Sequence, residues 1–237
     1  MPEPLLRVEA ADVFYGVSQV LFGIDIAVEK GQTMALLGRN GAGKSTTFKA
    51  IAGIAPPRRG RVVLGGRTVS GQPPYRIARA GIGYVPEDRQ VFPEHTIDDN
   101  LVVGAKRGAR GELDWTRETI YEVFPLLAAM KNRVAGRLSG GEQQMLTIAR
   151  TLMGNPEVVL LDEPSEGLAP IIVQAIGELI RKLRAMGVTI LLAEQNMHFC
   201  LGIATHATVI DKGQVVYRAT VAELRDNEEI KHRYLAV

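Results

Sequence analysis

One glycine-rich segment limits the folds open to this chain more than any other feature. Residues 38–45 read Gly-Arg-Asn-Gly-Ala-Gly-Lys-Ser, which matches the pattern of a phosphate-binding P-loop. The apolar run at residues 33–37 predicts a strand before the loop, and residues 45–52 predict a helix after it. A working P-loop needs this strand–loop–helix context. The chain is therefore expected to be an α/β protein that binds phosphate at a sheet edge.

The residue types in this loop suit the phosphates of a nucleotide. Glycines let successive backbone N–H groups point at phosphate oxygens, and the helix that follows adds its positive dipole end. Lys44 is predicted to neutralise the outer phosphates, and Ser45 to offer its hydroxyl to Mg²⁺. The predicted nucleotide-binding residues are Gly38, Arg39, Asn40, Gly41, Ala42, Gly43, Lys44, Ser45 and Thr46. Kinases, GTPases and helicases share this loop, so the reaction depends on motifs downstream.

Short apolar runs alternate with helical patterns along the chain and predict the sheet. The runs lie at residues 33–37, 81–85, 158–161, 188–193 and 207–210. Their near-continuous apolar character is typical of parallel strands that are covered on both faces. Extended segments at residues 5–15 and 24–28, with a short pair at 61–64 and Val69, predict an additional antiparallel β-layer. The predicted fold class is α/β, a P-loop NTPase core with a mainly parallel sheet.

The strand pattern disappears between residues 96 and 155, where a helical insertion is predicted. Within it, Ile120, Val123, Phe124 and Leu127 have helical spacing, which predicts a helix over residues 116–130. Glycine and proline clusters at 56–60 and 104–111 predict loops inside the domain rather than a long linker. The sequence thus predicts a single domain over residues 1–237, with a helical signature subdomain inserted at about 96–155.

Two acidic residues follow the buried run at 158–161, at the sheet edge where α/β folds bind nucleotides. Asp162 is predicted to hold Mg²⁺, directly or through water. Because successive strand residues point to opposite sides, Glu163 can have a different task, to orient or deprotonate the water that attacks the γ-phosphorus. With the P-loop, these acids indicate an enzyme that acts on a nucleotide.

The segment from Leu138 to Gln144 reads LSGGEQQ and precedes a helical run at residues 145–153. A serine hydroxyl and the bare N–H groups of two glycines at a helix start form a second anion-binding surface. On these residues the chain resembles the ABC ATPase family. In that family this signature caps the γ-phosphate of ATP held by a second subunit, which implies a head-to-tail dimer with two shared ATP sites. The residues that the resemblance assigns to this task are Ser139, Gly140, Gly141, Glu142 and Gln143.

The same resemblance assigns roles to further positions. Tyr15 stands where an aromatic ring stacks on adenine, and residues 165–170 match the loop that crosses the dimer interface. Glu87 stands where most relatives have a glutamine that contacts Mg²⁺ and reports to the membrane subunit. Gln195 replaces the usual histidine at the γ-phosphate, and its amide can donate a hydrogen bond but cannot become positively charged. The predicted catalytic residues are thus Glu163, Lys44 and Gln195, and the predicted metal-site residues are Ser45, Asp162 and Glu87.

Glu87, Gln195 and the stretch at residues 166–170 resemble one branch of this family, the shorter of the two ATPases of branched-chain amino acid importers. The resemblance implies ATP and Mg²⁺ as cofactors and an ATPase dimer, formed with a paralogous subunit or with a second copy. It also implies two membrane permease subunits and, indirectly, a solute-binding protein. Related importers of urea, amides or other amino acids are alternatives, as are a soluble non-transport ABC ATPase and a regulatory nucleotide-binding protein without turnover.

Composition bears on location and on partners. No uninterrupted apolar run exceeds five residues, far below the roughly 20 that a helix needs to cross a bilayer. The 28 basic and 26 acidic residues are spread along the chain, so nothing indicates a nucleic-acid partner. The chain is expected to lie peripherally at the cytoplasmic face of the inner (plasma) membrane.

Overall fold

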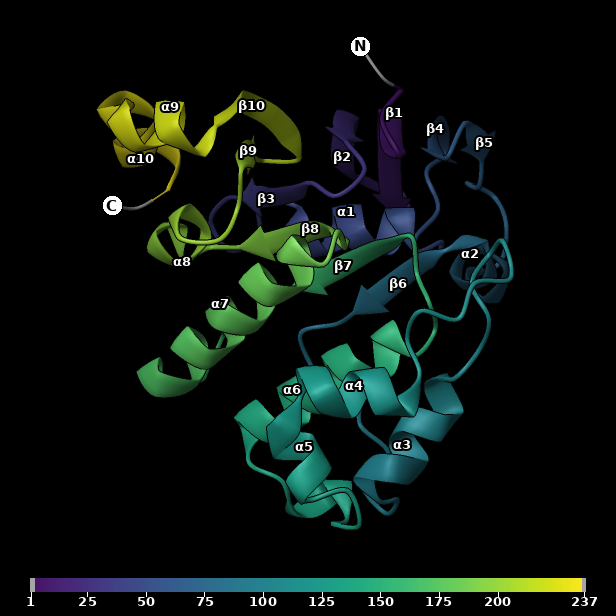
Figure 1. Cartoon of the computed structure of the whole chain (residues 1–237). Coiled ribbons are helices and arrows are strands. Elements are labelled where there is room, and N and C mark those ends of the chain that lie inside the picture. The colour runs from purple at the N-terminus through teal and green to yellow at the C-terminus, as the bar shows by residue number, and fades with distance from the viewer. Residues whose placement is uncertain (1–2, 236–237) are drawn as a thin grey trace.

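A computed structural model describes residues 3–235, which form two sheets and a group of helices (Figure 1). The strands are β1 (Leu6–Tyr15), β2 (Ser18–Val28), β3 (Thr33–Leu37), β4 (Arg59–Leu64), β5 (Arg67–Thr68), β6 (Ile82–Val85), β7 (Val158–Asp162), β8 (Thr189–Glu194), β9 (His206–Asp211) and β10 (Gln214–Thr220). The helices are α1 (Lys44–Ile51), α2 (Pro74–Ala80), α3 (Ile97–Gly104), α4 (Arg117–Val123), α5 (Pro125–Ala129), the 3₁₀ turn η1 (Ala135–Arg137), α6 (Gly140–Leu152), α7 (Pro170–Ala185), α8 (Met197–Leu201), α9 (Val221–Asp226) and α10 (Glu228–Tyr234).

The central sheet has six strands in the order β10-β9-β3-β8-β7-β6. All neighbouring pairs from β9 to β6 are parallel, and only the edge strand β10 pairs antiparallel with β9. The predicted α/β class and mainly parallel sheet are confirmed, and β3 has the predicted bounds. Because β3 lies between β9 and β8, the loop that follows it opens at the middle of one sheet edge.

Strand periodicity divides the sheet residues between two hydrophobic cores. Ala35 and Leu37 of β3 join the core that contains α6 and α7, whereas Met34 and Leu36 join the core that contains α1 and the antiparallel sheet. Successive side chains on a strand point to opposite faces, so a fully apolar strand must be covered on both. In Figure 1 the antiparallel sheet and α1 lie above the central sheet, and α7 and the helices α3 to α6 lie below it.

The antiparallel sheet has the strand order β2-β1-β4-β5, which confirms the predicted β-layer. Some of the predicted boundaries are wrong. β2 begins at Ser18 rather than at residue 24, β4 begins at Arg59, inside a predicted loop, and β5 ends at Thr68, so it leaves out Val69. Gly60 explains the second difference, because a Cβ there would lie 2.3 Å from the Ala10 carbonyl oxygen. The glycine is needed for close approach to β1 rather than for a turn.

The predicted continuous helix over residues 116–130 is wrong. The structure has two short helices, α4 and α5, which meet at Phe124 with φ −120° and ψ 68°. Pro125 is the cause, because it has no N–H and disfavours helical geometry in the residue before it. The four apolar residues with helical spacing are nevertheless all buried, as expected; they are Ile120, Val123, Phe124 and Leu127. The signature helix α6 begins at Gly140, in agreement with the helix start predicted at the two glycines.

Asn155 joins the end of the helical segment to the start of β7. It is buried and has a left-handed φ of 47°. Its side-chain oxygen accepts a hydrogen bond from the Trp115 N–H at 2.8 Å, and its side-chain nitrogen donates to the Lys106 carbonyl at 2.8 Å. One side chain therefore fixes two segments of the loop that leads from α3 to α4.

Replacing Asn155 with alanine is expected to lower the free energy of unfolding by about 2–3 kcal/mol, because buried backbone groups lose their partners and the left-handed backbone becomes strained. Urea denaturation measures this change. Asn155→Gly is the matched control, since glycine removes the bonds but tolerates the backbone, so it should cost less than alanine. Equal stability of Asn155→Ala and the wild type would contradict the proposed bridging role.

Candidate functional site

The P-loop lies between β3 and α1 and is closely packed against its neighbours. A Cβ on Gly38 would lie 2.4 Å from the Ile210 carbonyl oxygen, so a side chain is excluded there. Gly43 has φ 113°, and a Cβ there would lie 2.7 Å from a methyl carbon of Leu21. Glycine is required at both positions for these reasons, and the loop is held rigidly at the start of α1.

The predicted base and the P-loop lysine lie side by side. Lys44 Nζ is 3.0 Å from Glu163 Oε1, and only 3% and 9% of these side chains are exposed. Lys44 Nζ also donates to the carbonyls of Gly38 at 2.9 Å and Arg39 at 3.1 Å. Its ammonium group is thus fully engaged by oxygen atoms of the chain. Phosphate oxygens can replace these acceptors, since they accept charge-assisted hydrogen bonds and carry negative charge as the Glu163 carboxylate does.

Glu163 is held in an unusual backbone conformation. Its φ is 46°, in the left-handed region that non-glycine residues rarely occupy, and its N–H donates to the Ala193 carbonyl at 2.9 Å. Strain of this kind costs about 1–3 kcal/mol and is concentrated at functional sites. The bend after β7 turns Glu163 toward Lys44, while Asp162 points elsewhere.

Asp162 faces the first residues of α1 instead. Its Oδ1 is 3.0 Å from the Ser45 hydroxyl oxygen, and its Oδ2 accepts a hydrogen bond from the Tyr84 hydroxyl at 3.0 Å. A hydroxyl and a carboxylate are hard oxygen donors of the kind that Mg²⁺ prefers together with substrate phosphates. Within residues 3–235, no group of three or more histidine, cysteine or acidic side chains could hold a metal without such phosphates. Since Mg²⁺ is usually bound through one or two carboxylates together with waters and substrate phosphates, the Ser45 and Asp162 donors fit a nucleotide-bound Mg²⁺.

The carboxylates of the site raise one another's pKa. Burial raises the pKa of Asp162 and that of Glu194. A hydrogen bond with Glu163, followed by burial and the charge of Glu163, raises the pKa of Glu166 to about 7. The charge of Glu87 also contributes to the raised pKa values of both Asp162 and Glu166. This excess of negative charge favours a bound cation.

Two residues of the site were missed by the sequence reasoning. Glu194 ends β8 as a buried carboxylate and accepts hydrogen bonds from the N–H groups of Ser165, at 3.1 Å, and Asn196, at 3.4 Å. It thereby fixes the loop after Glu163. A charged residue directly after the buried run at 188–193 was the available signal. Tyr84 gave no signal, because only the pairing of β6 with β7 brings it to Asp162.

The signature segment forms the start of α6. Ser139 is the N-cap residue, and its side chain and that of Glu142 form a reciprocal capping box, with distances of 3.3 and 2.7 Å. The Gln143 amide donates to the Ala135 carbonyl at 3.3 Å. A Cβ on Gly141 would lie 2.3 Å from a methyl carbon of Ile172. Glu142 and Gln143 therefore use their side chains to shape the helix start, and Ser139 remains exposed.

The remaining predicted site residues are not gathered with the P-loop lysine. Tyr15 lies at the end of β1 with 48% of its side chain exposed, and Gln195 is exposed directly after β8. Across residues 3–235, no hydrogen bond or ion pair joins residues 139–143 to residues 38–46. The predicted set thus divides into a P-loop cluster and a separate signature surface.

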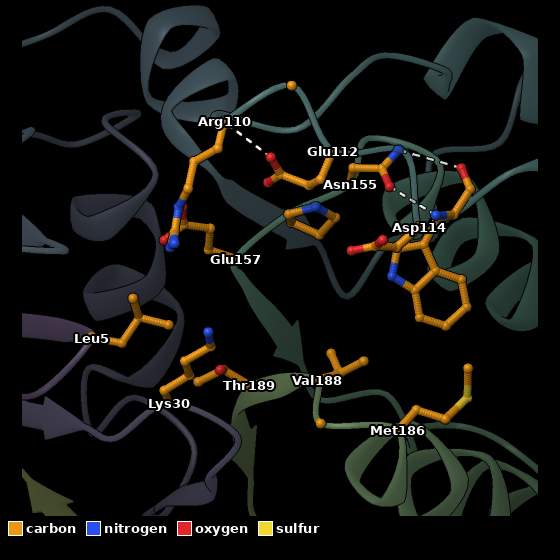
Figure 2. Close-up of a pocket in the computed structure, with 14 residues that line it drawn as sticks. Leu5, Lys30, Arg110, Glu112, Asp114, Asn155, Glu157, Met186, Val188 and Thr189 are labelled. Atoms are coloured by element: carbon orange, nitrogen blue, oxygen red, sulfur yellow. Dashed lines mark hydrogen bonds and ion pairs between the residues drawn. The ribbon is translucent and has the colours of Figure 1, made fainter.

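A cavity of about 710 Å³ lies at the opposite edge of the central sheet (Figure 2). Thr189, the first residue of β8, lines it, whereas the P-loop cluster lies beyond the last residues of β3 and β7. Arg110 and Glu157 form an ion pair of 3.1 Å in its wall. The cavity is therefore separate from the P-loop cluster, and none of the predicted site residues lines it.

Comparison with known protein families and structures agrees with this geometry. Residues 21–166 match the family model described as ABC transporter. The chain is 39% identical to the high-affinity branched-chain amino acid transport ATP-binding protein BraG of Pseudomonas aeruginosa, covering 98% of this chain and 99% of that protein. It is 36% identical to the probable branched-chain amino acid transport ATP-binding protein LivF of Archaeoglobus fulgidus, covering 96% and 97%.

A solved structure extends the agreement to the whole fold. The ADP conformation of MJ1267, an ATP-binding cassette of an ABC transporter, superposes with a TM-score of 0.83 at 26% identity, covering 98% of each chain. None of the helices in the described residues 3–235 is both long and apolar enough to span a membrane.

Proposed function

This chain belongs to the ABC transporter family of ATP-binding proteins, and from that premise we propose that it is the ATP-hydrolysing subunit of an importer for branched-chain amino acids. The observation that carries the proposal is the division of the site into two parts, a P-loop cluster with Lys44 and Glu163 in contact and an outward-facing signature. Two half-sites on one chain call for a second chain to complete each ATP site. The similarity to BraG and LivF supports the choice of solute.

In the proposed mechanism, ATP phosphates enter the P-loop and displace Glu163 from Lys44. The ammonium group then stabilises negative charge on the outer phosphates, while the released Glu163 carboxylate orients and deprotonates the attacking water. Ser45, Asp162 and Glu87 would hold Mg²⁺, which when bound would supply further charge stabilisation. Tyr15 stacks on adenine, and the Gln195 amide donates a hydrogen bond to the γ-phosphate.

The signature residues of one subunit bind the ATP held by the other, so that ATP closes the dimer and hydrolysis reopens it. ATP drives closure only as far as it binds the closed state better than the open one. The second subunit is a paralogous ATPase or another copy, and the dimer acts on two membrane permeases supplied by a solute-binding protein. The chain thus works as one ABC ATPase domain with a helical subdomain, peripherally at the cytoplasmic face of the membrane.

Reconstitution tests the proposal. The chain is co-purified with its membrane subunits and solute-binding protein, and ATPase activity is measured in proteoliposomes. Leucine, isoleucine or valine is expected to stimulate hydrolysis several-fold, with urea as the control solute. Stimulation by urea alone would assign the related importer class, and absence of any associated membrane subunit would contradict a transport role.

Glu87 is predicted to make ATP binding depend more strongly on metal. Its negative charge near Asp162 and Glu166 repels phosphates unless Mg²⁺ compensates. Glu87→Gln is therefore expected to raise ATP affinity in EDTA by about two- to fivefold and to reduce the gain from Mg²⁺. Isothermal titration with and without the metal measures both quantities. Glu94→Gln, an exposed carboxylate in the same loop, is the control, and identical metal dependence in Glu87→Gln and the wild type would refute the idea.

A further inference from the structure

Arg89 occupies a strained turn in the loop that follows β6. Arg89 has φ 63° and Gln90 has φ 32°, so two successive non-glycine residues adopt left-handed backbone. Such conformations are rare for residues with a Cβ and persist only where the surroundings hold them. The turn begins two residues after Glu87, in the same loop as this predicted metal-site residue.

Helix α6 holds this turn in place. The Thr147 hydroxyl contacts the Arg89 carbonyl, and Arg150 Nη2 donates to the Gln90 carbonyl at 2.6 Å. The Arg150 guanidinium also lies 4.9 Å from the centre of the Phe92 ring, which fixes the next part of the loop. Two consecutive carbonyls are thus bound by side chains from the helix that begins with the signature.

The side chain of Arg89 lies between two segments of the proposed dimer face. Its Nη2 donates to the Glu166 carbonyl at 3.3 Å, and a Cβ on Gly167 would lie 3.9 Å from the same nitrogen. A Cβ on Gly140 would lie 2.5 Å from Nη1, so the guanidinium group occupies the space next to the second signature residue. Because Gly140 has no side chain, the Arg89 guanidinium can occupy this space.

The contacts of Arg89 are not those of an ordinary surface ion pair. Within residues 3–235, no carboxylate lies within 4.0 Å of its guanidinium nitrogens, and its polar partner is a backbone carbonyl. A planar guanidinium directs its donors rigidly, so it sets a spacing between the groups it contacts. The spacing in this case is that between the start of α6 and residues 166–167.

We propose that Arg89 is a positioning residue that couples the Glu87 loop to both segments that face the second subunit, the signature start and the Glu166–Gly167 turn. The inference rests on the proposed function, because the spacing between the two segments matters only if they complete the ATP site of the second subunit. A displacement of the Glu87 loop would withdraw the guanidinium and separate the two segments. The loop therefore controls the shape of the dimer face through one side chain.

Hydrogen exchange in the full chain without nucleotide tests the positioning directly. Arg89→Met keeps an apolar stem and removes the guanidinium, and the amides of residues 139–142 and 165–168 are expected to exchange about tenfold faster. Arg89→Lys should give an intermediate increase in the exchange rates of the same segments, and this variant is used for the test if Arg89→Met does not fold. Arg181→Met is the matched control, because Arg181 likewise donates to a single carbonyl, that of Gly202, at 3.4 Å.

Steady-state kinetics tests the consequence for the ATP site. Arg89→Met is expected to lower kcat about fivefold with the KM for ATP changed less than twofold, because the P-loop cluster is untouched. Wild-type exchange rates in both segments, or an unchanged kcat, would overturn the proposal. The exchange measurement uses single subunits without ATP, so it does not depend on the proposed function. An inactive wild type would count against that function alone.

Discussion

Replacing Glu163 with glutamine is expected to lower kcat for ATP hydrolysis by at least about 10²-fold while ATP binding persists. Glutamine is close to glutamate in size, so the bend after β7 and the hydrogen bond to the Ala193 carbonyl are preserved. The amide cannot accept a proton from the attacking water. It also releases Lys44 from an ion pair of 3.0 Å, which leaves the ammonium group free for phosphate.

The same variant should accumulate as an ATP-bound dimer, because ATP hydrolysis, the step proposed to reopen the dimer, is blocked. Size-exclusion chromatography with Mg²⁺ and ATP measures the dimer, first with the chain alone and then with the paralogous subunit proposed as its partner. Glu166→Gln is the matched control, since Glu166 is hydrogen-bonded to Glu163 but largely exposed, and it should retain most of the activity. A Glu163→Gln variant with more than a third of the wild-type rate would exclude Glu163 as the base.

The sheet could be predicted because its strands carry their own signal. A parallel strand buried on both faces must be apolar throughout, and β3 and β7 meet this condition with every residue buried. The edge strand β10 was not predicted, because its apolar run Val215-Val216-Tyr217 is short and its side chains are half-buried or exposed. The break between α4 and α5 could have been found, since Pro125 stands inside the predicted helix.

The site was predictable only where its chemistry is local in the sequence. The P-loop and the acidic pair are short motifs, and the parallel pairing of β3, β8 and β7 brings their ends to one edge. The contacts of Tyr84 with Asp162 and of Glu194 with Ser165 join residues that lie far apart in the chain. The position of Arg89 depends on two left-handed residues without glycine, for which sequence patterns give no indication. Such long-range contacts come from packing rather than from periodicity.

Replacing Lys44 with methionine is expected to weaken ATP binding by about 10- to 100-fold, because charge-assisted hydrogen bonds to phosphate are lost. Methionine keeps most of the volume of this buried side chain. Equilibrium titration with a fluorescent ATP analogue measures the change in Kd. Lys49→Met is the control, because Lys49 lies in the last turn of α1 and outside the predicted nucleotide-binding residues, and an equal loss of affinity in both variants would contradict a specific role for Lys44.

The ion pair gives Lys44→Met a second expected effect, on stability without nucleotide. Glu163 would stay buried after losing Lys44, the one cation in ion-pair contact with it within residues 3–235, and this loss costs on the order of 2 kcal/mol. Because glutamine removes the unpaired charge, the double variant Lys44→Met/Glu163→Gln should recover much of this loss. Urea denaturation of the wild type, both single variants and the double variant completes a double-mutant cycle, which gives the interaction free energy of the two side chains. Additive losses would mean that the two side chains do not interact in the free protein, and the displacement of Glu163 by ATP would then have no energetic basis.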